Sequence, residues 1–191
     1  MDKNEVMDRK TFLKMGFLKV AEPFVAMVES KVKEATKRRV LRPPGAIEEV
    51  AFLTKCTRCD DCVTACHQKA IKHASEYDGL AAGTPIVVPN EMPCYLCDEF
   101  VCITACIEGA LQMVKREEVK MGIAAINTKR CHRWAGIDPM CDYCFDRCPL
   151  KGKAICLDDK GPEIDDKKCA GCGICEYVCP SDPKAVIVTP L

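Results

Sequence analysis

The sequence predicts a small α+β fold that is organised around metal centres rather than around a large apolar core. Seventeen of the 191 residues are cysteine, and sixteen of these fall into four groups of four. After each group, an alanine is followed by a β-branched or leucine side chain. The hydrophobic fraction of 48% includes the cysteines, and only one Trp, four Tyr and six Phe are present. Something other than an apolar core must therefore nucleate the fold.

The composition argues against several classes of protein. No apolar stretch approaches the roughly 18 residues that a membrane-spanning helix needs, so we expect no membrane span. An odd number of cysteines without a secretory signal peptide argues against a disulfide scaffold. No G-x-G-x-x-G, P-loop or G-x-S-x-G motif is present, and no motif of a nucleic-acid-binding domain is recognisable. We therefore expect neither a catalytic site nor a nucleic-acid partner.

The first and last cysteine groups share one spacing, in which two, two and three residues separate successive cysteines. Bacterial ferredoxins use this run to bind 4Fe-4S clusters, and in two-cluster ferredoxins its last cysteine ligates the other cluster. The groups are therefore expected to work in pairs. The first group is Cys56, Cys59, Cys62 and Cys66, and the last is Cys169, Cys172, Cys175 and Cys179, followed by Pro180.

The two central groups are variants of the same run. The second group widens its middle gap to four residues, and the third opens its first gap to nine, while both keep the final gap of three. Such changes place a longer loop over a cluster without moving the ligands that follow. The second group is Cys94, Cys97, Cys102 and Cys106, and the third is Cys131, Cys141, Cys144 and Cys148.

An internal repeat accompanies the cysteines and predicts the local structure around each cluster. The small alanine allows a short helical turn to lie against the cluster, and the apolar run that follows it is expected to begin a covering strand. Four copies of one cluster-binding unit are therefore predicted. The repeated pairs are Ala70-Ile71, Ala110-Leu111, Ala154-Ile155 and Ala185-Val186.

Other metal chemistry fits the sequence less well. Zinc sites with four cysteines usually combine two C-x2-C knuckles across a long spacer, and the run from Cys62 to His67 has one residue too many for covalent haem attachment. The three histidines are not needed as ligands, because the cysteines already suffice. Cys156 is left over, and we expect it to be a small buried hydrophobic residue beside Ile155.

Several stretches between residues 41 and 191 resemble a known family, the MauM and NapG type of ferredoxin. This family belongs to the sixteen-cysteine iron-sulfur subunits that serve molybdopterin oxidoreductases and quinol dehydrogenases. The stretches are Leu41-Arg42-Pro43-Pro44-Gly45-Ala46, Gly83-Thr84-Pro85, Pro93-Cys94, the third group with Pro149 and Leu150, Gly161-Pro162, and 172–180.

The resemblance implies two ferredoxin-like two-cluster modules, one inserted in the other. Residues 43–191 would form this polyferredoxin domain, with an outer module at about 43–75 and 157–191 and an inserted module at about 76–156. Cys179 would complete the site of Cys56, Cys59 and Cys62, and Cys66 that of Cys169, Cys172 and Cys175. Cys148 would complete Cys94, Cys97 and Cys102, and Cys106 would complete Cys131, Cys141 and Cys144.

Residues 1–42 are expected to form a helical extension and a basic linker. Apolar residues recur from Thr11 to Val32 in two amphipathic pieces separated near Pro23. The stretch Arg9-Lys10-Thr11-Phe12-Leu13-Lys14 resembles the twin-arginine export signal of the family with its second arginine replaced by lysine. We interpret it as degenerate and expect a cytoplasmic protein; the alternative is export to the periplasm.

Charges near each cluster are expected to tune its reduction potential, because a cation favours the more negative reduced state. Cationic residues flank three of the groups, whereas Asp98 and Glu99 lie in the second group without a neighbouring cation. The cluster held by the second group should then have the lowest potential. The cations are Lys55 and Arg58 at the first group, Lys129, Arg130 and Arg133 at the third, and Lys167 and Lys168 at the fourth.

Together these observations predict a non-catalytic subunit that relays single electrons through four 4Fe-4S clusters. The alternative is a structural or redox-sensing iron-sulfur protein. The expected partner in a hetero-oligomer is a molybdopterin or tungstopterin oxidoreductase subunit, such as an aldehyde oxidoreductase. A quinol dehydrogenase or nitrate-reductase chain with a cytochrome is the other possibility.

Overall fold

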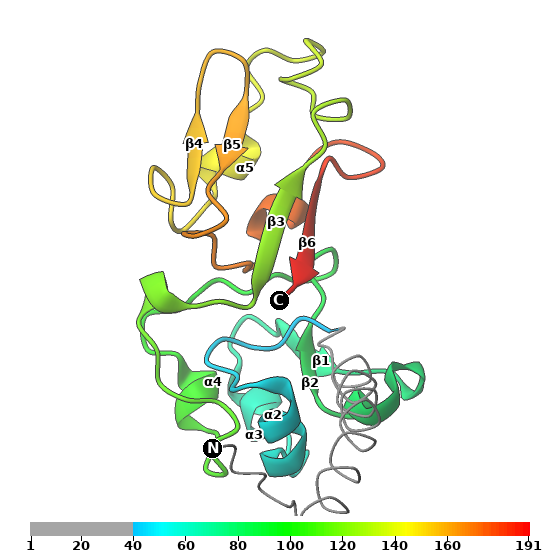
Figure 1. Cartoon of the computed structure of the whole chain (residues 1–191), viewed down its shortest axis with the longest axis vertical. Helices are drawn as coiled ribbons and strands as arrows, with labels where there is room; N and C mark the ends of the chain where they lie inside the picture. The colour runs from blue at the N-terminus through cyan, green and yellow to red at the C-terminus, as the bar shows by residue number, and fades with distance from the viewer. Residues whose placement is uncertain (1–39) are drawn as a thin grey trace, which may run out of the picture. The chain divides into compact units, whose positions relative to one another are not determined.

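A computed structural model of the chain describes residues 40–191 (Figure 1). The helices expected between residues 11 and 32 lie outside the described residues, as does nearly all of the extension 1–42. No helix within 40–191 is long and apolar enough to cross a membrane. The described elements form two consecutive halves, which we call the first module (residues 40–115) and the second module (residues 116–191).

The first module consists of short helices and one hairpin, which lie in the lower half of Figure 1. Its first helix, α2 (Glu49–Lys55), is capped by Glu48, whose carboxylate accepts hydrogen bonds from the backbone N–H groups of Val50 and Ala51. The strands β1 (Ile71–His73) and β2 (Pro85–Val87) pair antiparallel, with Ile71 opposite Val87. The other elements are α3 (Asp61–Ala65), the 3₁₀ helix η1 (Glu76–Ala81) and α4 (Val101–Thr104).

The second module contains two antiparallel strand pairs, which lie in the upper half of Figure 1. The strands β3 (Gly122–Ile126) and β6 (Val186–Pro190) pair with Gly122 opposite Pro190, so the end of the chain returns to the start of the module. The hairpin of β4 (Ile155–Leu157) and β5 (Pro162–Ile164) places Ile155 opposite Ile164. The helical elements are η2 (Arg116–Glu118), α5 (Tyr143–Asp146) and α6 (Ile174–Tyr177).

The predicted repeat of a helical turn and a strand is confirmed for groups one, three and four, whereas group two is followed by an isolated bridge rather than a strand. The helices α3, α4, α5 and α6 each carry the third cysteine of their group. Strands begin at Ile71, Ile155 and Val186, and Leu111 forms an isolated bridge with Ala46. All four alanines and all four following side chains are buried. The α+β prediction therefore holds at the level of the repeating unit.

The inserted arrangement of the modules is not what the structure shows. The helix α3 contacts α4 and α5 contacts α6, so residues 76–115 fold with 43–75, and residues 116–156 fold with 157–191. The physical reason is chain connectivity. The β1–β2 hairpin turns the chain back, and α4 of group two then contacts α3 of group one. The two modules follow one another along the chain.

The modules meet at a backbone contact and through a shared apolar core. The N–H of Cys94 donates to the carbonyl oxygen of Cys172 at 2.9 Å. Beside it, a Cβ added to Gly173 would lie 2.5 Å from Cβ of Pro89, so only glycine allows this approach. One continuous apolar core, which includes Phe52 and Val188, extends through both modules.

Candidate iron-sulfur sites

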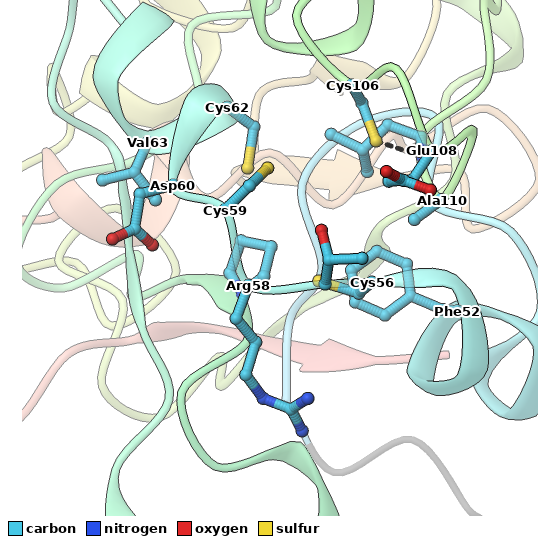
Figure 2. Close-up of a pocket in the computed structure, with 13 residues that line it drawn as sticks. Phe52, Cys56, Arg58, Cys59, Asp60, Cys62, Val63, Cys106, Glu108 and Ala110 are labelled. Carbon is cyan, nitrogen blue, oxygen red and sulfur yellow. Dashed lines mark hydrogen bonds between the residues drawn. The ribbon is translucent and has the colours of Figure 1, made fainter.

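The first candidate site, site A, is a hollow of about 400 Å³ lined by Cys56, Cys59, Cys62 and Cys106. Three of its cysteines come from the loop between α2 and α3 and from α3 itself, and the fourth comes from the end of group two. Figure 2 shows the side chains of Cys59, Cys62 and Cys106 extending into the hollow, whereas the guanidinium of Arg58 points away from it. Arg58 instead donates to the carbonyl oxygen of Ala82 at 3.0 Å.

The second site, site B, is a hollow of about 390 Å³ on the other side of the same module. It is lined by Cys94, Cys97 and Cys102 of group two and by Cys66, the last cysteine of group one. The repeat residues Ala70 and Ile71 also line this hollow. Groups one and two therefore exchange their last cysteines.

The third site, site C, repeats this arrangement in the second module. A hollow of about 400 Å³ is lined by Cys169, Cys172 and Cys175 of group four and by Cys148 of group three. The repeat residues Ala154 and Ile155 line it, as Ala70 and Ile71 line site B. Three hollows of nearly equal size, each with four cysteines, indicate sites for copies of one prosthetic group.

The fourth site, site D, is inferred from the effect of its cysteines on one another's pKa. The pKa of Cys144 is raised to about 12, by burial first and then by the charges of Cys131, Cys141 and Cys179. Burial also raises the pKa of Cys141, again with contributions from Cys131 and Cys179. Three cysteines of group three are thus gathered with the last cysteine of group four.

The structure corrects the ligand pairing that the resemblance implied. Cys106, not Cys179, lies with Cys56, Cys59 and Cys62, and Cys66, not Cys148, lies with group two. Cys179 accordingly lies with group three and Cys148 with group four. All four groups end in the same gap of three residues. The spacing therefore predicts that groups exchange their last cysteines, but it does not predict which groups form a pair. Twelve of the sixteen predicted cysteines line three hollows, and the other four, Cys131, Cys141, Cys144 and Cys179, are related through their influence on the pKa of Cys141 and Cys144.

Backbone N–H groups point at the sulfur of one cysteine in each site. Ala70 donates to Cys66 at 3.3 Å and Leu111 to Cys106 at 3.4 Å. In the second module, Gly171 donates to Cys169 and Ala185 to Cys179, both at 3.4 Å. Three of the four donors belong to the sequence repeat, so part of its role is to direct an amide at the last cysteine of a group. Hydrogen bonds of this kind stabilise negative charge on cluster sulfur.

The buried thiols resist deprotonation unless a positive charge is present. Burial raises the pKa of Cys62, Cys94 and Cys172 to about 12 and that of Cys102 to about 11. Neighbouring cysteine charges contribute to each of these raised pKa values. Four thiolates in one apolar hollow therefore need a cationic core, and the donor set of each site fits the iron-sulfur core of a 4Fe-4S cluster.

Cys179 is an exception among these thiols. Its burial acts to raise the pKa, but N–H groups of Ala185 and Ser181 and the Ser181 hydroxyl outweigh burial, so its pKa is lowered. Within residues 40–191, no three His, Cys, Asp or Glu side chains form a site of the kind that holds one metal ion. The sulfurs line the walls of hollows instead.

A buried arginine supports site A, and the sequence did not reveal its role. Arg42 is fully buried and donates through Nε and Nη2 to the carboxylate of Glu49 at 3.1 and 2.5 Å. Its Nη1 donates to Oγ1 of Thr84 at 2.6 Å and to the carbonyl oxygen of Pro85 at 3.0 Å. Its guanidinium lies 4.4 Å from the ring centre of Phe52, which lines site A. The stretches 41–46 and 83–85, which carried the resemblance, are thus two halves of one buried network.

Two further expectations are wrong. Cys156 is exposed, because the alternation of a strand turns Ile155 into the core and Cys156 outward. Asp98 is not without a cation, since it accepts from Arg116 at 2.6 Å. The basis for assigning the lowest potential to the second group is therefore lost.

Comparison with known proteins agrees with these sites. The family described as a 4Fe-4S dicluster domain matches residues 55–110, which span groups one and two, and a 4Fe-4S binding domain matches residues 162–183. The ferredoxin-type protein NapG of Escherichia coli (strain K12) is 36% identical over an alignment of 165 positions, which covers 79% of this chain and 71% of that protein. The methylamine utilization ferredoxin-type protein MauM of Methylophilus methylotrophus is 34% identical over an alignment of 194 positions, which covers 95% of this chain and 84% of that protein.

Proposed function

This chain belongs to the NapG and MauM family of ferredoxin-type iron-sulfur electron-transfer proteins, and from that premise we propose that it relays single electrons through four 4Fe-4S clusters. Each of sites A to D would hold one cluster through its four cysteines. A bound cluster of this type accepts and releases one electron at a time. The chain would add no catalytic step and would act as a wire subunit of a larger oxidoreductase complex.

One observation carries this proposal: within each module, the two cysteine groups exchange their last cysteines. That exchange brings two sites close together, as electron transfer between them requires. The pKa of Cys62 in site A is raised, after burial, by Cys106 and by Cys102 of site B. The pKa of Cys175 in site C is raised well above its ordinary value by burial and, among others, by Cys144 of site D.

The contact between the modules supports a continuous order A–B–C–D. Cys94 of site B donates its N–H to the carbonyl oxygen of Cys172 of site C, and Cys172 contributes to the raised pKa of Cys94. Sites A and D are then the two ends, where partner proteins would deliver and collect electrons.

For the partner, we propose a molybdopterin or tungstopterin oxidoreductase subunit in the cytoplasm. The ground is Lys10, which stands where the resembling export signal has its second arginine. A quinol dehydrogenase with a cytochrome is the second candidate, because the resemblance implies subunits that serve quinol dehydrogenases.

An anaerobic pull-down of the tagged protein from its own cells tests the partner, and iron and sulfide analysis of the product tests the clusters. About 16 iron atoms per chain are expected from four clusters, together with a pterin-containing subunit from the cytoplasm. Recovery of a quinol-oxidising membrane protein or a cytochrome would favour the second candidate. Clusters that cannot be reduced reversibly while the protein stays folded would support a structural or sensing role instead.

A further inference from the structure

Two lysines of the second module hold their ammonium groups against backbone carbonyls of predicted ligands. Nζ of Lys120 donates to the carbonyl oxygens of Asp166, Lys167 and Cys169 at 3.2, 2.6 and 2.8 Å. Nζ of Lys184 donates to those of Tyr177 and Cys179 at 3.0 and 2.7 Å. Cys169 belongs to site C and Cys179 to site D. Each of these two sites therefore has one fixed cation beside a cysteine.

Within the described residues, neither ammonium forms an ion pair. No carboxylate oxygen lies within 4.0 Å of Nζ of Lys120 or Lys184 among residues 40–191, whereas two of the cations that the sequence suggested are paired or turned away. Lys168, which precedes Cys169, pairs with Asp165 at 3.2 Å, and the guanidinium of Arg58 points out of site A. In the described part of the first module, no lysine donates to the carbonyl of a cysteine.

The ammonium groups are close enough to act on the clusters. Four covalent bonds join a carbonyl oxygen to Sγ of the same cysteine, so each Nζ lies within roughly 8 Å of that sulfur. This distance does not exceed the screening length of about 8 Å at physiological ionic strength. The charge is therefore felt at the cluster even where the lysine side chain faces solvent.

The second module needs such cations more than the first does. Six of its eight predicted ligands are buried and none is exposed, whereas Cys59 and Cys97 of the first module are exposed. Reduction adds a negative charge to a cluster that is already anionic, and a buried site lacks the water that would stabilise it. Without compensation, sites C and D would accept electrons less readily than sites A and B.

We propose that Lys120 raises the reduction potential of the cluster at site C and that Lys184 raises that of the cluster at site D. The reduction potentials of the two clusters in the second module would thereby stay close to those of the clusters in the first module. In the transfer from B to C, one electron leaves the cluster of site B, which is oxidised, and enters that of site C, which is reduced. The redox partner proteins supply and remove electrons at the ends. This inference rests on the proposed four-cluster function.

A redox titration of the anaerobically purified full-length holoprotein, followed by electron paramagnetic resonance, tests it. Lys120→Gln removes the charge and keeps an N–H donor, and Lys184→Gln does the same at site D. Each variant is expected to shift one midpoint to more negative potential, and the two variants should shift different midpoints. Lys120→Arg and Lys184→Arg should retain the wild-type midpoints.

Lys168→Gln is the matched control, because Lys168 is the sequence neighbour of Cys169 but its charge is paired. It should move the midpoints less than Lys120→Gln does. Unchanged midpoints in both glutamine variants, with iron content preserved, would overturn the inference and leave the proposed function standing. A uniform shift of all midpoints would also overturn it, because the effect would not be local. A wild-type protein without reducible clusters would overturn both.

Discussion

The two modules contain the same pair of cysteine groups in different surroundings. In the first module Cys59 and Cys97 are exposed, whereas the second module has no exposed ligand. No lysine of the described first module caps a cysteine carbonyl, whereas the second has one beside each site. The cysteine spacing thus determines how a cluster is wrapped, while the rest of the chain determines how much water and charge the cluster meets.

The modules also differ at the backbone positions that precede the short helices. Asp60 and Phe100, two residues before Cys62 and Cys102, adopt left-handed conformations with φ of 68° and 42°. The corresponding residue in group four is Gly173, with φ of 91°. The first module therefore has side-chain-bearing residues in a strained backbone conformation at these positions, and the side chain of Phe100 is buried in the core. The second uses glycine where the modules approach one another.

The pairing within modules gives the largest expected effect. Cys106→Ser should remove the cluster of site A and lower the iron content by about four atoms of about 16. The double variant Cys56→Ser/Cys106→Ser should lose no further cluster, because both residues belong to one site. Iron and sulfide analysis checks this, with Cys156→Ser as the control that keeps all iron. Loss of a second cluster in the double variant would restore the pairing of Cys106 with group three.

We expect that disrupting the buried network around Arg42 destabilises the first module more than the second. Arg42→Met removes the guanidinium that binds the buried carboxylate of Glu49 and should lower the free energy of unfolding by about 3–5 kcal/mol. The cluster of site A should be lost before those of sites C and D, as spectra recorded during denaturant titration would show. Adding Glu49→Gln to this variant should recover part of the stability. A double variant no more stable than Arg42→Met would mean that loss of the ion pair does not cause the destabilisation.

The close approach of Gly173 to Pro89 at the junction between the modules gives the next largest expected effect. Gly173→Ala would place Cβ 2.5 Å from Cβ of Pro89 and force alanine into a left-handed conformation. We expect a loss of about 2–4 kcal/mol in unfolding free energy. Gly136→Ala is the matched control, because Gly136 has φ of 70° but no atom within 4 Å of the added Cβ. Its cost should be only the conformational part, about 1–2 kcal/mol. Equal losses in both variants would argue against a clash at the junction.

The sequence was sufficient to predict most of the repeating unit and the grouping of the first three cysteines of a run at one hollow, because both depend on local spacing. Ala70 and Ile71, for example, follow Cys66 closely enough that one turn and one strand fix their positions. It was not sufficient for the pairing of groups, since Cys66, Cys106, Cys148 and Cys179 stand in equivalent positions of their runs. The choice among them depends on long-range chain connectivity.

Charge placement could not be predicted for a related reason. Lys168 is adjacent to Cys169 in sequence and pairs with Asp165, whereas Lys120 reaches the carbonyl of Cys169 across 49 residues of sequence. The sequence position of a long, flexible side chain therefore does not predict where its charged group lies. Arg42 shows the same point, because its partner Thr84 lies 42 residues further along the chain.

The exposure of Cys59 and Cys97 predicts the order in which the clusters lose iron. An anaerobic incubation of the holoprotein with an iron chelator should remove iron from the first module several-fold faster than from the second, because water and chelator reach an exposed ligand first. The measurement follows the paramagnetic resonance signals of the reduced clusters in samples taken over time. Cys156→Ser should leave both rates unchanged, since that exposed thiol belongs to no site. Faster loss from site C or D would mean that the buried sites open in solution, and that access to the cluster depends on motion rather than on the static exposure of its ligands.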